Sequence, residues 1–136
     1  MPEATFNKFN CFVADVHNGE HNLASNQLEV ALSNVAPVAS DTVANTEISY
    51  TNLSSRDITT TSSTQTSGTY KLILVDLTLT ASVGDVATFR YVIVRNKTKT
   101  KLIGWYDYGS AITLHGDVSD QFIVDFSQVN GLITET

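Results

Sequence analysis

The amino-acid sequence predicts an all-β fold: an antiparallel β-sandwich, jelly-roll-like, of about eight strands, with one short N-terminal helix. Apolar residues alternate with polar ones in the C-terminal third, as at Phe122, Val124 and Phe126. Turn signals such as Asn130-Gly131 separate these runs at intervals of about eight to twelve residues. A period of two that is interrupted by such turns is typical of half-buried antiparallel strands. The length of 136 residues predicts a single domain over residues 1–136.

The N-terminal segment, residues 1–19, differs from the rest because its apolar residues are spaced for a helix. This spacing predicts a helix over about residues 4–17, which Asn18-Gly19 would end. Its narrow apolar stripe must pack either on the sheet of its own domain or on a neighbouring subunit. The apolar residues recur at three- and four-residue steps, at Phe6, Phe9, Phe12, Val13 and Val16.

Runs of alternating or β-branched residues predict the strands in chain order. Val86–Arg95 is the strongest of them, with apolar residues on both faces. The long irregular segment 34–56 predicts a functional loop or an arm. Ile58–Thr66 is rich in Thr and Ser and has no strongly apolar face, so we expect it at a sheet edge or in an intersubunit contact. The predicted strands are residues 27–33, 58–66, 70–75, 77–80, 86–95, 102–108, 112–115, 121–127 and 132–135.

Composition and charge exclude several classes of function. The net charge of −6 gives the chain no general attraction to nucleic acid or to anionic lipid, so we expect neither as a partner. The single cysteine, Cys11, excludes an internal disulfide, and its apolar neighbours predict an inert buried thiol. No stretch is long and apolar enough to span a bilayer, and residues 1–10 lack the pattern of a signal peptide. We therefore expect a protein that is made and kept in a cytoplasm, or packaged from one.

The histidines are the main candidates for chemistry. The stretch His17–His21 matches the letters of the H-x-x-E-H zinc-protease motif, but that motif needs a continuous helix and Asn18-Gly19 predicts a helix end. We therefore interpret both histidines as surface residues. His115, near Ser110 and Asp117, lacks the G-x-S-x-G elbow of a hydrolase and is interpreted as a solvated turn residue. The sequence thus predicts a protein that is not an enzyme, with no catalytic residue, no metal site and no cofactor.

The segment Leu102–Gly109, LIGWYDYG, places three aromatic residues on one predicted strand. Alternation puts Trp105 on the face opposite Tyr106 and Tyr108, so the three cannot form one flat platform for a sugar ring. We interpret them as core or interface residues, with glycan binding as the alternative. Trp105 in particular is predicted to be buried and structural.

Five of the eight basic residues fall within twelve positions, from Arg90 to Lys101. One interpretation is a solvated hairpin tip whose lysines prevent edge-to-edge aggregation. The other is a cationic tip that meets an acidic surface on a partner. Together with the N-terminal aromatic residues, this tip supplies the predicted interface candidates: Phe6, Phe9, Phe12, Arg95, Lys97, Lys99 and Lys101.

Short motifs run through most of the chain: His17–Gly19, His21–Leu23, Leu28–Leu32, Thr66–Leu72, Phe89–Val92, Leu102–Gly109, Phe122–Phe126 and Asn130-Gly131. As a set, these motifs resemble a family of small β-sandwich structural proteins from the virions of tailed bacteriophages. The chain departs from the family pattern at His115–Asp120, which is longer than the turn that family members have there.

The resemblance implies a place in the virion and brings no catalytic residues with it. From it we expect a non-enzymatic capsid decoration (cement) protein that stabilises the phage head and is made in the cytoplasm of the bacterial host. Its expected partners are the major capsid protein and further copies of itself, with a homotrimer favoured. A long arm such as residues 34–56 and an apolar N-terminal helix would suit such a clamp. The alternative is a tail or adsorption component that binds a glycan.

Overall fold

The computed structural model describes residues 4–44, 46–127 and 131–135. Within these ranges it has one α-helix, α1 (Asn10–His17), and one 3-10 turn, η1 (Gly116–Val118). The strands are β1 (Phe6–Lys8), β2 (Leu28–Ser33), β3 (Asp57–Ile58), β4 (Thr60–Thr66), β5 (Thr69–Leu74), β6 (Leu77–Thr80), β7 (Phe89–Asn96), β8 (Lys101–Ile112), β9 (Gln121–Val124) and β10 (Ile133–Glu135).

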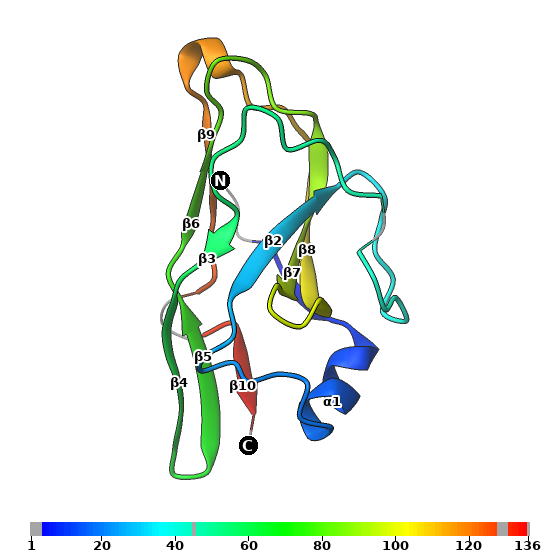
Figure 1. The fold of residues 1–136 in the computed structure, drawn as a ribbon, viewed down its shortest axis with the longest axis vertical. Coiled ribbons are helices and arrows are strands. Elements are labelled where there is room, and N and C mark those ends of the chain that lie inside the picture. The colour runs from blue at the N-terminus through cyan, green and yellow to red at the C-terminus, as the bar shows by residue number, and fades with distance from the viewer. Residues whose placement is uncertain (1–3, 45, 128–130, 136) are drawn as a thin grey trace.

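The strands pair antiparallel and form two layers (Figure 1). The first layer is a five-stranded sheet in the order β1-β8-β7-β2-β3. The second layer is divided into a three-stranded sheet, β10-β5-β4, and a two-stranded sheet, β6-β9. In Figure 1 the two smaller sheets follow one another along one side of the molecule, and β2, β7 and β8 cross the other side. The predicted all-β antiparallel sandwich with one short helix is confirmed.

The main core lies between the two layers, because the apolar residues of both layers point inward. The five-stranded sheet contributes Val92 and Val94, and the second layer contributes Leu72, Leu74 and Phe122. Each of these side chains is at most 1% exposed. The alternation that predicted β9 therefore has its expected cause, a strand with one face in the core.

The five-stranded sheet is also covered on its outer face. A second buried cluster lies there, and the chain around α1 and segment 34–56 supply part of it. As a result β2 is buried at all six of its positions, although its alternating sequence predicts one solvent-exposed face. The members of the outer cluster are Phe9, Ala31, Ile93 and Leu102, with Cys11, Ala44 and Trp105 packed against them.

The predicted helix over residues 4–17 is wrong in its first part and right at its end. Phe6–Lys8 form the strand β1, and the helix begins only at Asn10. It ends at the predicted place, where Gly19 has a φ of 79° and its N–H bonds to the carbonyl of Val16. At eight residues it is short, and no helix in the described ranges is long and apolar enough to cross a membrane.

Gly104 explains why a strand can lie where a helix was predicted. β1 pairs with β8 so that Lys8 stands opposite Gly104 and Phe6 opposite Tyr106. A Cβ at position 104 would collide with the Phe6 ring and with the carbonyl oxygen of Asn7. Only glycine therefore leaves room for β1 against this part of β8.

Two predicted strands change their bounds. β8 is continuous to Ile112, so the predicted break between residues 108 and 112 is not present. The predicted strand 58–66 is divided into β3, which pairs with β2, and β4, which pairs with β5 and has an irregularity between Thr60 and Ser62. β4 is the outer strand of its sheet, which confirms its predicted position at an edge.

The segment 34–56 forms no named strand in its described residues and is held to its own chain at both ends. Near its start, the carbonyl of Ala39 accepts a hydrogen bond of 2.8 Å from the N–H of Asn10. Near its end, the hydroxyl of Tyr50 accepts from the N–H of Leu32 at 3.0 Å. The predicted loop or arm is therefore a cover on the five-stranded sheet, and its exposed apolar side chains are Val35, Val38 and Val43.

Trp105 is half-buried rather than fully buried as the sequence predicts. Its ring centroid lies 4.6 Å from that of Phe9, on the outer face of the sheet, while Tyr106 lies in the main core as alternation requires. We expect Trp105→Ala to lower the free energy of unfolding by about 2 kcal/mol, less than for a fully buried tryptophan, because part of the ring remains in water.

Urea unfolding measures this loss, and the fluorescence of the only tryptophan reports its surroundings directly. Wild-type and Trp105→Ala proteins that unfold at the same urea concentration would show that the Phe9 contact adds no stability.

Candidate interaction site

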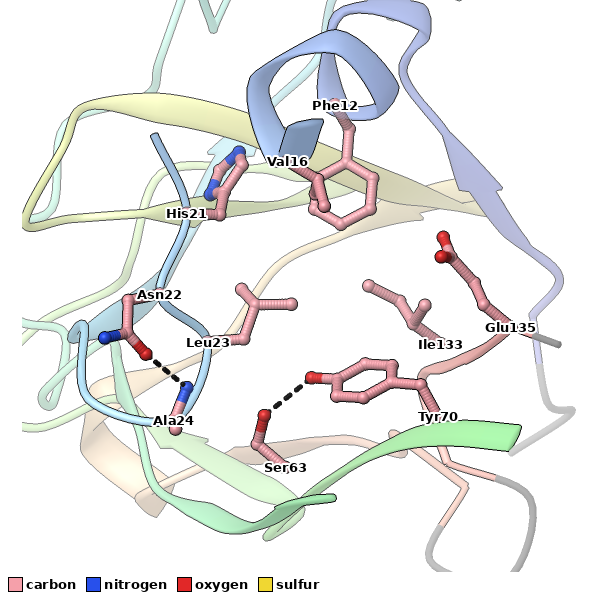
Figure 2. A pocket seen from close by; sticks show the side chains of 10 residues that line it. All are labelled: Phe12, Val16, His21, Asn22, Leu23, Ala24, Ser63, Tyr70, Ile133 and Glu135. Atoms are coloured by element: carbon pink, nitrogen blue, oxygen red, sulfur yellow. Dashed lines mark hydrogen bonds between the residues drawn. The ribbon is translucent and has the colours of Figure 1, made fainter. Parts of the chain in front are cut away.

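A pocket of about 400 Å³ lies between α1, the loop that follows it, the β4–β5 hairpin and β10 (Figure 2). These segments are far apart in the sequence and meet only in the folded chain. The residues that line the pocket are Phe12, Val16, His21, Asn22, Leu23, Ala24, Ser63, Tyr70, Ile133 and Glu135.

The walls of the pocket are mainly apolar. Phe12 and Val16 come from one face of α1, as the helical spacing of the N-terminal segment predicts. Figure 2 shows Leu23 and Ile133 on opposite sides of the hollow, pointing toward each other. Phe12 is only 1% exposed and closes the pocket toward the core. A pocket of this size and lining is typical of sites that bind a small ligand or a side chain.

A hydroxyl pair lies at one side of the pocket. The phenol oxygen of Tyr70 and Oγ of Ser63 are 2.7 Å apart, across the β4–β5 hairpin. Burial is the main cause that raises the pKa of Tyr70, with the nearby carboxylate of Glu135 acting in the same direction. The phenol is therefore neutral at physiological pH and can exchange hydrogen bonds but not act as an anion.

His21 lines the pocket and is held by a buried asparagine. Its Nδ1 lies 3.1 Å from Nδ2 of Asn96, whose own Oδ1 accepts from the N–H of Lys99. Since Nδ2 is a donor, Nδ1 of His21 must accept, and the ring proton belongs on Nε2. Nε2 is buried and has no hydrogen-bond partner among the described residues. Asn96 also donates to Oδ1 of Asn26 at 2.8 Å, so one side chain ties this loop to the β7–β8 hairpin.

The stability of the protein is expected to fall as the pH drops below the ordinary pKa of histidine, about 6.5. Burial lowers the pKa of His21, and Lys101 acts in the same direction, while Asp15 and Glu20 oppose the shift. At a pH between the lowered pKa and 6.5, His21 is protonated in the unfolded chain but not in the folded chain. The free energy of unfolding therefore decreases as the pH falls through this range, and protonation of His21 does not affect it at higher pH.

Urea unfolding at pH 7.0 and 5.5 measures this loss, and His21→Gln should reduce its size. His17→Gln is the matched control, because His17 is exposed at the end of α1. An equal pH dependence in the wild type and His21→Gln would contradict the assignment.

The charge around the pocket is mainly acidic. Glu135 lies at its rim and is exposed. Asp15 and Glu20 raise the pKa of His21 by their charge, and Lys101 lowers it. The pocket therefore combines an apolar interior with a net negative surrounding.

The structure corrects the role of the predicted aromatic interface residues. Phe9 and Phe12 are each 1% exposed, Phe9 in the outer cluster and Phe12 in the main core, so neither offers a surface to a partner. Phe6 is half-buried and its ring lies 5.2 Å from that of Tyr106. The apolar stripe of the N-terminal segment is thus used within its own domain. Cys11 is half-buried, and burial raises the pKa of its thiol.

The predicted cationic tip is smaller than the sequence indicates. Arg95 is turned away from it, because its side chain is only 16% exposed and pairs with Glu29 and Glu47. Lys97 lies 2.9 Å from Asp57 in an exposed ion pair. Lys99 is exposed, and Lys101 is half-buried near α1. The hairpin tip therefore presents little uncompensated positive charge for an acidic partner.

The histidines of the described ranges do not belong to a metal-binding cluster. The described residues contain no group of three or more His, Cys, Asp or Glu side chains that could hold a metal ion. The prediction that His17 and His21 both lie on the surface is wrong for His21, which is half-buried with its ring 5.0 Å from that of Phe12. His115 is exposed, as predicted, and its Nδ1 lies 3.4 Å from Asp85.

Sequence reasoning missed the pocket as a site. Its residues carry no motif of chemistry: Phe12 and Val16 belong to the predicted apolar stripe, and His21, Leu23 and Tyr70 lie in motifs of the family resemblance. No protein-family model, no curated protein and no solved structure matches this chain.

Proposed function

We propose that the protein is a non-enzymatic structural component of a tailed-bacteriophage virion, a capsid decoration (cement) protein that binds the major capsid protein and stabilises the head. It is made in the cytoplasm of the bacterial host and carried in the virion. The observation that supports this proposal most is that the motifs behind the family resemblance are the residues that build the fold.

The glycines of these motifs serve the backbone. Gly19, Gly68, Gly109 and Gly131 each have a positive φ, between 78° and 84°, at the turns or strand irregularities where the motifs lie. Gly104, in the motif LIGWYDYG, admits β1 against β8. A set of motifs that specifies turns and close strand contacts is what a family of rigid structural proteins would share.

The polar groups that meet in the pocket also support a role without catalysis. The Tyr70 hydroxyl is paired with Ser63, and the acceptor nitrogen of His21 is occupied by Asn96. General acid–base catalysis needs such groups to be free to reach a substrate and to carry a pKa near the working pH. Here they hold the loop and the hairpin in place.

The open edge of β4 supports assembly of the protein with further copies of itself. We propose that this assembly is a homotrimer. In the described chain β4 has β5 as its one neighbour, and Figure 1 shows it as the outermost strand of its layer. Thr60–Thr66 contains no charge and no proline, the usual means of blocking an open edge. An uncharged edge lets copies of a chain of net charge −6 approach without local repulsion.

One observation favours the alternative, a tail or adsorption component that binds a glycan. A hollow of about 380 Å³ lies over the β4–β5 hairpin and is lined by Ser62, Thr64, Thr66, Thr69, Lys71 and Ile73. Hydroxyl groups around one apolar side chain are suited to hydrogen bonding with a sugar. A glycan array, with Thr64→Ala as the variant that should lose binding, tests this alternative.

Location and copy number in purified virions test the main proposal. A decoration protein is expected on the order of hundreds of copies per particle, on the shell seen by cryo-electron microscopy. About a dozen copies at the tail would favour the alternative, and no copies at all would exclude both. Light scattering of the isolated protein tests the trimer. The proposed oligomer would be contradicted if the isolated protein were a monomer and also did not assemble when added to phage heads from which it is missing.

A further inference from the structure

We propose that the pocket between α1 and the β4–β5 hairpin binds an apolar side chain that a partner protein presents next to a basic residue. This inference goes beyond the proposed function and does not depend on the location of the protein in a virion. It rests on the lining of the pocket, on the charge around it and on the state of His21.

The lining selects an apolar group. Phe12, Val16, Leu23 and Ile133 form most of the wall, and Figure 2 shows the centre of the hollow bounded by Leu23, Ile133 and the ring of Tyr70. The volume of about 400 Å³ is within the range of roughly 300–1,000 Å³ that is typical of ligand pockets. The pocket opens to the surface, so a side chain projecting from another protein can enter it.

The surrounding charge selects a cation beside that apolar group. Glu135 is an exposed residue that lines the pocket, and the charges of Asp15 and Glu20 act on His21. The opposing base is Lys101. A Lys or Arg next to the inserted side chain would meet this excess of negative charge, whereas an acidic neighbour would be repelled.

The state of His21 argues against an anionic occupant. Its lowered pKa keeps the ring uncharged, and Nδ1 already accepts from Asn96. The ring therefore brings no positive charge to the wall, and its buried Nε2 is without a hydrogen-bond partner among the described residues. A carboxylate or phosphate entering the pocket would find no cation within it, since the residues that line it include no Lys or Arg.

Short blocked peptides test the proposal with the full-length protein. The methyl NMR signals of Leu23 and Ile133 report the pocket directly. We expect acetyl-Lys-Phe-Lys-amide to shift them with a millimolar dissociation constant, and acetyl-Glu-Phe-Glu-amide to bind at least roughly fivefold more weakly. Acetyl-Lys-Ser-Lys-amide should shift neither signal, and binding of the first peptide should weaken in high salt.

Two variants separate the apolar from the electrostatic contribution. Ala24 is exposed and lines the pocket, so Ala24→Phe should fill it and abolish binding without loss of folding. Ala111→Phe, at an exposed position near the end of β8, is its matched control. Glu135→Gln should weaken binding of the basic peptide by roughly threefold, while Asp117→Asn, in η1 at the opposite end of the molecule in Figure 1, should not.

Several outcomes would overturn the proposal. The first is the absence of any methyl NMR shift with the basic peptide at about 10 mM, on the order of the weakest dissociation constants considered. The second is equal binding of the acidic and basic peptides. The third is unchanged binding of the basic peptide to Ala24→Phe. Each of them leaves the virion proposal standing, because that proposal is tested by location and copy number.

Discussion

Replacing Arg95 by alanine is expected to lower the free energy of unfolding by about 3 kcal/mol. Its Nε donates to Glu29 at 2.8 Å, and its two terminal nitrogens lie 3.0 and 3.1 Å from the carboxylate oxygens of Glu47. The Glu29 side chain is only 8% exposed, so the substitution leaves a buried carboxylate with a single base, Arg56, at 3.7 Å. Because the contact with Arg56 remains, the expected loss of unfolding free energy is at the lower end of the range for breaking a buried ion pair.

Urea unfolding of Arg95→Ala measures this effect, and Arg90→Ala is the matched control. Arg90 makes the same kind of two-point contact with a carboxylate, at 2.9 and 3.2 Å from Asp107, but at the surface. Its loss should leave the unfolding midpoint nearly unchanged, because exposed ion pairs contribute little. Adding Glu29→Gln to Arg95→Ala should restore part of the stability. The interpretation fails if the Arg95 and Arg90 variants behave alike.

Phe12→Ala is expected to cost about 3–5 kcal/mol, because it removes a fully buried ring from the main core. Phe12 is 1% exposed, and its ring also supports His21 at a centroid distance of 5.0 Å. Thermal and urea unfolding measure the loss. Val13→Ala is the control on the same helix, since Val13 is 45% exposed and should tolerate the change.

The burial of Phe9 and Phe12 favours one of the two predicted packings of the N-terminal segment, the one within its own domain. If its helix packed on a neighbouring subunit, deletion of residues 1–19 would weaken assembly more than folding. Because β1 is part of the five-stranded sheet and Phe9 and Phe12 are buried in the chain's own clusters, the deletion should instead reduce the strand signal in circular dichroism. A native spectrum for the deleted chain would show that α1 and β1 are dispensable for the fold.

β5, β6 and β9 could be predicted from the sequence because each has one face in the core, and β7 because it is apolar on both faces. Phe122 and Val124 alternate with exposed residues, and the hairpin at Ser67-Gly68 has the turn residues it requires. β1 could not be predicted, since three residues carry no period and its partner in β8 is distant in the sequence. The apolar steps through Phe6 and Phe9 fit a helix equally well.

The burial of Glu29 and the presence of the pocket could not be predicted from the sequence for a different reason. Both depend on segments that are brought together only by the tertiary fold: Glu29 meets Arg95 and Arg56, and Leu23 meets Ile133. A sequence pattern reports which side of a strand is apolar, but it does not report what covers the other side. For the same reason Arg95 was grouped with the lysines of the hairpin tip, although it points to the covered face.

The pairing of β1 with β8 constrains the order in which the chain can fold as it is synthesised. Residues Phe6–Lys8 are synthesised well before their partner Gly104–Tyr106, because the strands β2 to β7 lie between them in the sequence. The β4–β5 hairpin, by contrast, closes through a two-residue turn and needs no distant partner. β1 must therefore stay unpaired, with Phe6 uncovered, until β8 has been made. Nascent chains that end before residue 104 should be the ones that aggregate or require a chaperone.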